Sequence, residues 1–395
     1  MSMKENEIQV LGHESKSGWR HLWPWLVAFV VVALIVGILI GRFAIREPRI
    51  ETRLDHYGEC TIDSALQQTV DSLLADQLQN VNAQSGQAIV MEVATGEIRA
   101  LVGLQRRFDG AFEPCQNFGH QQESALMRVV SALALLETGQ VKPDSRVETG
   151  SGMYMYHGQV VKDHNWRRGG YGMLSMDEVV RYSSNVGMCR LMEKTDYEKT
   201  PQTFFARLDS MSFGKPDSLL DVPVLRPMTY TSPDDSEWEP SDLAFHLFGC
   251  ERRIAPLQML AFFNAIANDG CMVEPQLYIA DTLVINPRIA MPDHIQEMQV
   301  VLRNIVRDGL GKKGGTDLVE TAGCVGSATV RVGQNEELDY DDNEYRLEFC
   351  GYFPAQHPRY SIIVSMNKIG LPASGGGMAG PVFRQIVEYM VGQGQ

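Results

Sequence analysis

The sequence predicts an α+β domain, an antiparallel sheet flanked by helices with a helical subdomain, behind one apolar segment near the N-terminus. Three observations lead to this fold class. The predicted elements run in the order hairpin, several helices, three strands and a last helix. A sheet built from both chain ends leaves the helices between them as an inserted part. The 395 residues, 44% hydrophobic and 21% charged, are enough to fill one large domain or two ordinary ones.

The apolar segment covers residues 22–41, an uncharged run long enough to cross a bilayer. Trp23 and Trp25 lie at its start, where interfacial aromatic residues belong. The run exceeds a signal-peptide core and no small-x-small cleavage site follows, so we predict an uncleaved transmembrane anchor. Residues 1–21 are predicted as a polar tail and residues 42–85 as a short connector. The flanking charges do not decide the orientation of the anchor.

The elements follow one another by pattern. The connector contains Leu66, Val70, Leu73 and Leu74 at helical spacing. A β-hairpin is predicted at residues 87–102, with its turn at residues 94–96. Four further helices are predicted with both bounds: from after Ser124 to about Gly139, over 255–270, over 291–308, and from Pro381 to Val391. Another helix is predicted to begin at the capping box at Ser175. Strands are predicted over 319–332, 345–353 and 360–367, with turns and short strands over 140–175, irregular chain over 200–248 and an acidic loop over 333–343.

Composition excludes some classes of function. The formal net charge is −14 and no basic stripe is visible, which argues against a nucleic-acid partner. The seven cysteines show no C-x-x-C pair and no Cys/His ligand spacing, so we expect no metal site, and no cofactor motif is present. Cys60 and Cys115 flank the start of the globular part. They are candidates for a disulfide if that part lies outside the cytoplasm.

Ser124 precedes a segment that is apolar nearly all round from Ala125, which is typical of a helix buried in a core. Its hydroxyl has two interpretations, a helix N-cap or a nucleophile at the positive end of the helix dipole. Residues three and four later share its face of the helix. Met127 has no proton to exchange and Arg128 keeps its proton, so a nucleophile here lacks a base. Position alone favours the cap and leaves the nucleophile open.

Residues 86–392 resemble the transpeptidase domain of penicillin-binding proteins, especially those of class B. The resemblance rests on segments in the same order: 89–98, 171–175 with 182–188, 254–259, 351–360 and 379–383. It implies the penicillin-binding-protein and serine β-lactamase-like fold over residues 86–395. The family uses three motifs, S-x-x-K, S-x-N and K-T-G.

The resemblance assigns the site residues. Ser124 takes the position of the nucleophile, and Met127 replaces the first lysine. The second motif is intact, with Ser183 as the relay serine and Asn185 as the amide that holds the substrate. In the third motif Cys324 replaces the lysine. The substrate-binding positions implied there are Cys324, Val325, Gly326 and Ser327.

Both motif lysines are therefore absent. General-base assistance is worth about a hundred- to ten-thousand-fold in rate, and losing a second cation compounds the loss. The sequence thus favours a non-catalytic homologue, a pseudo-transpeptidase. The alternative is an active D,D-transpeptidase or carboxypeptidase acylated at Ser124 through a displaced base.

Several residues are candidates for that base or for another reactive group. We interpret Ser212–Lys215 as a turn, although it also spells S-x-x-K, and His164 as a hydrogen-bonding loop residue. Cys324 is expected to be a buried, inert thiol, because no neighbouring cation is visible. Lys162, Lys312 and Lys313 remain as further candidates for a substitute amine.

The resemblance also implies a place in the cell. It predicts a single-pass protein of the inner membrane with its globular domain in the periplasm, working in peptidoglycan synthesis or division. The expected partners are the membrane and other cell-wall synthesis or division proteins, with a peptidoglycan stem peptide or a β-lactam as candidate ligands. The connector is too short for the pedestal domain that class B members usually carry.

Overall fold

The computed structural model describes residues 59–116, 118–215, 229–230, 232–250, 252–330 and 343–395. They belong to one compact unit, Glu59–Gln395. The predicted tail and anchor, residues 1–41, and the predicted acidic loop up to residue 342 lie outside the described residues. Within the described ranges, no helix is both long enough and apolar enough to span a bilayer.

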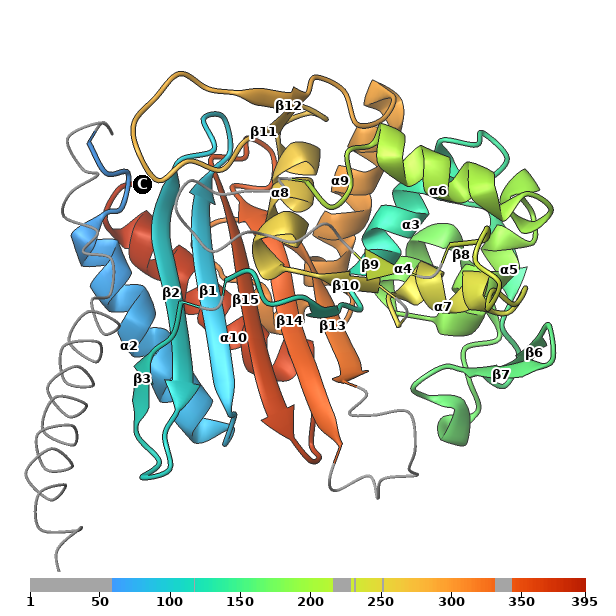
Figure 1. The fold of residues 1–395 in the computed structure, drawn as a ribbon, viewed down its shortest axis with the longest axis horizontal. Helices are drawn as coiled ribbons and strands as arrows, with labels where there is room; N and C mark the ends of the chain where they lie inside the picture. Colours follow the sequence, from blue (N-terminus) through green and yellow to red (C-terminus); the bar gives the residue numbers. More distant parts are fainter. Residues whose placement is uncertain (1–58, 117, 216–228, 231, 251, 331–342) are drawn as a thin grey trace, which may run out of the picture. The chain divides into compact units, whose positions relative to one another are not determined.

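A six-stranded antiparallel sheet organises the unit, in the order β13-β14-β15-β1-β2-β3 (Figure 1). Its strands are β1 Ser85–Glu92, β2 Ile98–Arg106, β3 Phe112–Pro114, β13 Ala322–Val330, β14 Glu344–Phe353 and β15 Tyr360–Ile369. The predicted hairpin and the three late strands are therefore confirmed. The hairpin lies beside the last strand of the chain, with Ile89 opposite both Leu101 and Ile363.

The remaining elements are helices and short strands. The helices are α2 Ser64–Asn80, α3 Met127–Leu136, α4 Met176–Arg181, α5 Asn185–Met192, α6 Pro201–Ser210, α7 Asp242–Phe248, α8 Pro256–Ala267, α9 Pro292–Arg307 and α10 Gly375–Gly392. Short strands form three small sheets that matter here: β4 Gln122–Glu123 with β10 Arg252–Ile254 and β9 Thr229–Tyr230, β5 Arg146–Glu148 with β8 Met173–Ser175, and β6 Met153–Tyr156 with β7 Gln159–Lys162. A fourth pairs β11 Met272–Val273 with β12 Val284–Asn286.

The two faces of the sheet belong to two cores. Successive side chains of a strand point to opposite faces. Ala88 and Val90 of β1 pack in the cluster built with α2 and α10, whereas Ile89 and Met91 pack in the larger cluster built with α8, α9 and the helical part. Figure 1 shows α2 and α10 on one face of the sheet and α8 on the other, with α3 to α7 gathered at the β13 side. This arrangement is the α+β fold that the sequence predicts.

The helix predicted inside the connector is α2, and it is part of the globular unit. Asp63 caps its start by accepting from Ala65 N and Leu66 N. Leu66, Val70, Leu74 and Leu78 are all buried against the sheet. The compact unit therefore begins at Glu59, earlier than the expected boundary at residue 86.

Two other expectations differ from the structure. The chain from 200 to 248, expected to be irregular, contains α6 and α7, and α6 buries Phe204, Phe205 and Leu208. Pro201 in the first turn and that apolar spacing are helix signals which the interpretation overlooked. The last helix begins at Gly375 rather than at Pro381, because Ser374 caps it by accepting from Gly377 N.

Candidate active site

Three segments of the chain bring the motif residues together. Ser124 lies between β4 and α3, Ser183 and Asn185 lie at the junction of α4 and α5, and Cys324 lies on β13 at the edge of the sheet. Two buried charged side chains connect the three segments. Arg128 of α3 reaches the second motif, and Glu348 of β14 reaches Ser124.

Ser124 is not a helix cap. The helix α3 begins at Met127, and the residue at its N-cap position, Leu126, makes no side-chain capping bond. The hydroxyl of Ser124 instead donates to Glu348 Oε2 over 2.5 Å, and Ser124 is only 1% exposed. The favoured interpretation from position alone was therefore wrong. A hydroxyl bound to a carboxylate in the interior is withdrawn from solvent.

Glu348 is held by a second buried charge. Its Oε1 lies 2.7 Å from Arg346 Nη2, and both side chains are fully buried. Arg346 also donates through Nη1 to Ile254 O over 3.1 Å. Glu348 lies directly opposite Gly326 in the β13–β14 ladder. A Cβ at Gly326 would lie 3.2 Å from Glu348 Oε2, so the glycine leaves room for the carboxylate.

Arg128 takes up the polar groups of the second motif. Its Nη1 donates to Ser183 Oγ, and its Nη2 donates to Asn185 Oδ1 over 2.9 Å. The side chain is buried, and loss of hydration lowers the pKa of its guanidinium, which nonetheless stays charged in a protein. Ser183 has a left-handed backbone with φ of 60°, which a residue with a side chain rarely adopts.

A buried aspartate forms hydrogen bonds with the segment that carries the second motif. Asp163 accepts from Ser184 Oγ over 2.8 Å and from Val186 N over 3.0 Å. Burial raises the pKa of the Asp163 carboxyl, and these hydrogen bonds oppose the rise. The amide of Asn185 donates to Lys162 O over 3.1 Å, so both ends of that amide are bound within the chain.

The replacements of the two lysines are buried. Met127 and Cys324 are each 1% exposed. Burial raises the pKa of the Cys324 thiol to about 11, although the nearby Arg128 lowers it. The expected burial of Cys324 is confirmed, whereas the absence of a neighbouring cation is not, because Arg128 lies nearby.

The other two positions of the third motif point elsewhere. Val325 packs in the cluster of α2 and α10, on the face of the sheet opposite Glu348. Ser327 Oγ accepts from Gly375 N over 2.8 Å, at the start of α10.

None of the weighed substitutes reaches Ser124. Lys162 Nζ lies 5.0 Å from the centroid of the Trp166 ring. Lys215 N donates to Ser212 O in the predicted turn, and His164 bonds Tyr171 Oη over 3.0 Å, as expected of a loop residue. Among the described residues no lysine hydrogen-bonds to Ser124.

The cysteine and metal predictions can be compared with the same residues. Cys60 and Cys115 are both free thiols, so the candidate disulfide is absent from this structure. No cluster of three or more His, Cys, Asp or Glu able to hold a metal ion occurs in the described part of the chain.

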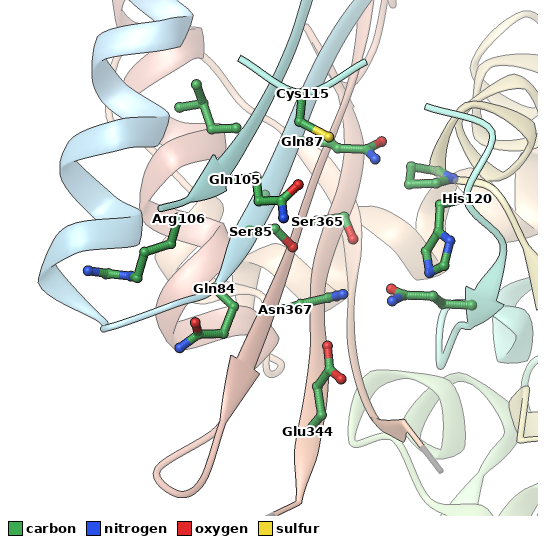
Figure 2. Close-up of a pocket in the computed structure, with 15 residues that line it drawn as sticks. Gln84, Ser85, Gln87, Gln105, Arg106, Cys115, His120, Glu344, Ser365 and Asn367 are labelled. Carbon is green, nitrogen blue, oxygen red and sulfur yellow. The ribbon is translucent and has the colours of Figure 1, made fainter. Parts of the chain in front are cut away.

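A polar cavity of about 410 Å³ lies over one end of the sheet (Figure 2). Ser85, Gln105 and Asn367 form its floor from neighbouring strands, and His120 and Glu344 line its sides. Burial lowers the pKa of His120. None of the motif residues lines this cavity.

Glu348, Arg346 and Asp163 were not found from the sequence. Arg346 and Glu348 alternate with apolar residues along β14, a pattern typical of a strand with one face in solvent. Both are in fact fully buried. Asp163 follows a lysine in a turn-rich stretch, and no local spacing relates it to Ser184.

Comparison with known proteins gives one consistent result. Penicillin-binding protein PbpB of Mycolicibacterium smegmatis is 25% identical over 367 residues, which are 84% of this chain and 54% of that protein. Peptidoglycan D,D-transpeptidase FtsI of Escherichia coli is 22% identical, over 85% of this chain and 56% of that protein. The chain thus matches about half the length of these relatives.

Comparison with solved structures shows that the chain has the same fold as a penicillin-binding protein transpeptidase domain. The transpeptidase domain of Burkholderia pseudomallei penicillin-binding protein 3 superposes with a TM-score of 0.71 at 22% identity, covering 85% of this chain and 96% of that one. A family model described as the penicillin-binding protein transpeptidase domain matches residues 86–388, the stretch that carries the sheet, α3, the second motif and β13. The chain therefore belongs to the penicillin-binding-protein transpeptidase domain family.

Proposed function

We propose that this protein is a non-catalytic member of its family, which acts as a binding or scaffolding partner in peptidoglycan synthesis or division. One observation carries the proposal. The hydroxyl in the nucleophile position is 1% exposed and donates to the carboxylate of Glu348. A serine in this state has neither an amine to take its proton nor access to a substrate.

The surrounding groups support the same conclusion. In an active site, polar groups are aimed at the place where charge develops in the transition state. Here Ser183 and Asn185 are bound by Arg128, and the Asn185 amide is bound also by Lys162 O. A stem peptide would have to displace these contacts, so we favour a protein partner over a ligand in the cleft.

The location proposed is the periplasmic side of the inner membrane. The apolar run at residues 22–41 supports a single-pass anchor. One relative is named a penicillin-binding protein, and FtsI is named a peptidoglycan D,D-transpeptidase. We infer a role beside such enzymes, with the domain tethered close to the membrane.

Penicillin acylation tests the loss of catalysis. The full chain in detergent is incubated with a fluorescent penicillin, and its intact mass is measured. We expect no adduct, with Ser124→Ala as the matched control and an active penicillin-binding protein as the positive control. A stoichiometric adduct that disappears in Ser124→Ala would overturn the proposal.

One observation favours a second candidate, an active acyl-transfer enzyme in which Glu348 is the base. The Ser124 Oγ to Glu348 Oε2 distance of 2.5 Å is within the reach of a general base. In this reading the carboxylate accepts the serine proton as Oγ attacks the acyl carbon. The acyl C–N bond then breaks, and the carboxylic acid returns the proton to the leaving nitrogen. An adduct that forms in the wild type and is lost in both Ser124→Ala and Glu348→Gln supports this candidate.

A genetic experiment tests the scaffolding role itself. In the native host, the gene is replaced by the Ser124→Ala form or deleted. We expect the Ser124→Ala strain to grow and divide as the wild type does, and the deletion strain to show a wall or division defect. A defect of equal size in both strains, with the Ser124→Ala protein present at normal level, contradicts the proposal.

A further inference from the structure

We propose that Cys324 and Cys350 are a disulfide-forming pair, which joins β13 to β14 when the protein folds in the presence of an oxidant. The two residues are direct partners in the antiparallel ladder. Direct partners in such a ladder point to the same face, with Cα atoms about 4.5–5.5 Å apart. A disulfide needs a Cα separation of about 4.4–6.8 Å. In this structure both are thiols.

The two strands approach closely beside this pair. The neighbouring partners are Gly323 and Gly351. A Cβ on Gly351 would lie 2.8 Å from Gly323 Cα, a contact that real Cβ atoms do not make. The pairing of two glycines allows this close approach, which also holds the adjacent cysteines near each other. Each cysteine is almost fully buried, at 1% for Cys324 and 0% for Cys350.

The place of the pair in the sheet gives the bond a consequence. Among the described strands, β13 is at the edge of the sheet and is hydrogen-bonded to it through β14. Cys350 points to the same face as Glu348, two residues earlier on β14, and Cys324 stands where the family motif has its lysine. A bond between the two sulfurs fixes the edge strand covalently beside the Ser124–Glu348 contact.

The chemistry is thiol–disulfide exchange with a small-molecule or protein disulfide. One cysteine thiolate attacks the oxidant and forms a mixed disulfide, releasing one oxidant thiol. The second thiolate then displaces the other oxidant thiol and forms the Cys324–Cys350 bond. The protein loses two protons and two electrons, and the oxidant gains them.

Burial of the two cysteines determines at which stage of folding the disulfide can form. It raises the pKa of Cys324 to about 11 and raises the pKa of Cys350, so little thiolate is present in the native state. Both sulfurs are also shielded from an oxidant. We therefore expect the bond to form while the strands assemble, and only slowly once the domain is folded.

The test is oxidative refolding of the full chain in detergent. Reduced, denatured protein is refolded either in a mixture of oxidised and reduced glutathione or in reductant alone. Both samples are then denatured, alkylated and digested for peptide mass mapping. We expect a linked peptide pair containing Cys324 and Cys350 in the first sample, about 2 Da lighter than the two thiol peptides together.

Variants make the assignment specific. Cys324→Ala and Cys350→Ala should each abolish the link and leave the other cysteine open to alkylation after denaturation. Cys189→Ala removes another buried cysteine, on α5, and should keep the link. If an alanine variant fails to refold, the wild-type peptide map alone decides.

Two results would overturn the proposal. One is that both cysteines remain fully alkylatable after oxidative refolding to a native circular dichroism spectrum. The other is that Cys324 is linked mainly to Cys250, which also lies near Arg128. The acylation experiment is to be run in reductant, so that neither of these results bears on it.

Discussion

The buried Arg346–Glu348 pair adds two charges to an interior that also holds the charged side chains of Arg128 and Asp163. Removing ions from water is costly, and the opposite charge of the partner offsets part of that cost. Each side chain makes one further hydrogen bond, whereas Arg346 Nε makes none with the residues that the structure describes. Glu348 accepts from Ser124, and Arg346 donates to Ile254 O. The hydroxyl at the nucleophile position is thereby part of a buried network of charges and hydrogen bonds.

This network predicts an asymmetric response to mutation. Glu348→Gln leaves Arg346 as a buried charge without a carboxylate, and we expect the free energy of unfolding to fall by about 3–5 kcal/mol. The double variant Arg346→Met, Glu348→Leu should lose clearly less, because no unpaired charge remains. Urea unfolding of the three proteins measures both effects. A loss below about 1 kcal/mol in Glu348→Gln would show that the pair contributes little.

Tyr154 gives a prediction for alkaline pH. Burial and its hydrogen bond to Glu193 raise the pKa of Tyr154 from 10.0 to about 12. Between these values the folded protein keeps the phenol proton and the unfolded chain has released it. The free energy of unfolding therefore falls as the pH rises through this window.

Tyr154→Phe should weaken that dependence. Denaturant unfolding between pH 9 and 11.5 compares the slopes of the two proteins. The absorbance of tyrosinate at 295 nm, taken as the difference between wild type and variant, follows the titration of Tyr154 itself. A midpoint near 10 for this residue would contradict the prediction.

At the scale of elements, the structure separates what local sequence determines from what it does not. The hairpin, α8, α9 and the three late strands follow from periodicity and from glycine and proline positions, and they are confirmed. The capping box at Ser175 opens α4 as expected. The prediction of irregular chain over 200–248 was wrong because burial makes a segment of mixed composition helical. In α6, Phe204 and Phe205 pack inward.

The site was predictable only in part for a related reason. The resemblance to the family rests on short local motifs, and through it the sequence assigned Ser124, Ser183, Asn185 and Cys324. The contact between Ser124 and Glu348 joins residues 224 positions apart, and no local spacing reveals it. Arg128 was considered only as a base for Ser124, although its guanidinium reaches across to the second motif.

The packing of α2 on the sheet predicts that this helix contributes to the stability of the domain. Leu74 is fully buried, whereas Leu73 is only partly buried. We expect Leu74→Ala to lower the free energy of unfolding by about 2–5 kcal/mol and Leu73→Ala to lower it by less. Denaturant unfolding of the full chain checks the difference. Equal effects would contradict the packing of α2 on the sheet.

At the scale of the whole molecule, the chain keeps the family fold, while Met127 and Cys324 occupy the positions of the two motif lysines. The fold matches that of the solved relative at a TM-score of 0.71 over 85% of this chain. Fold and activity are separable in this way because activity depends on a few side chains set on a much larger scaffold.

Restoring the lysines tests that separation. We expect the Met127→Lys, Cys324→Lys double variant to give no penicillin adduct, because Glu348 still holds the Ser124 hydroxyl. Adding Glu348→Ala should produce an adduct detectable by intact mass. Circular dichroism of both variants checks that they fold. Acylation of the double variant at the level of the triple variant would contradict the role given to Glu348.

The absence of a side chain at Gly326 has a consequence for the proposed loss of activity. The family motif has a glycine at this position, and here its bare backbone admits the chain's own carboxylate. On the proposed function, two lysine substitutions would not be enough to give activity, since the new ammonium groups would meet an anion that already belongs to the core. A return to catalysis would then need a third change, at Glu348 itself.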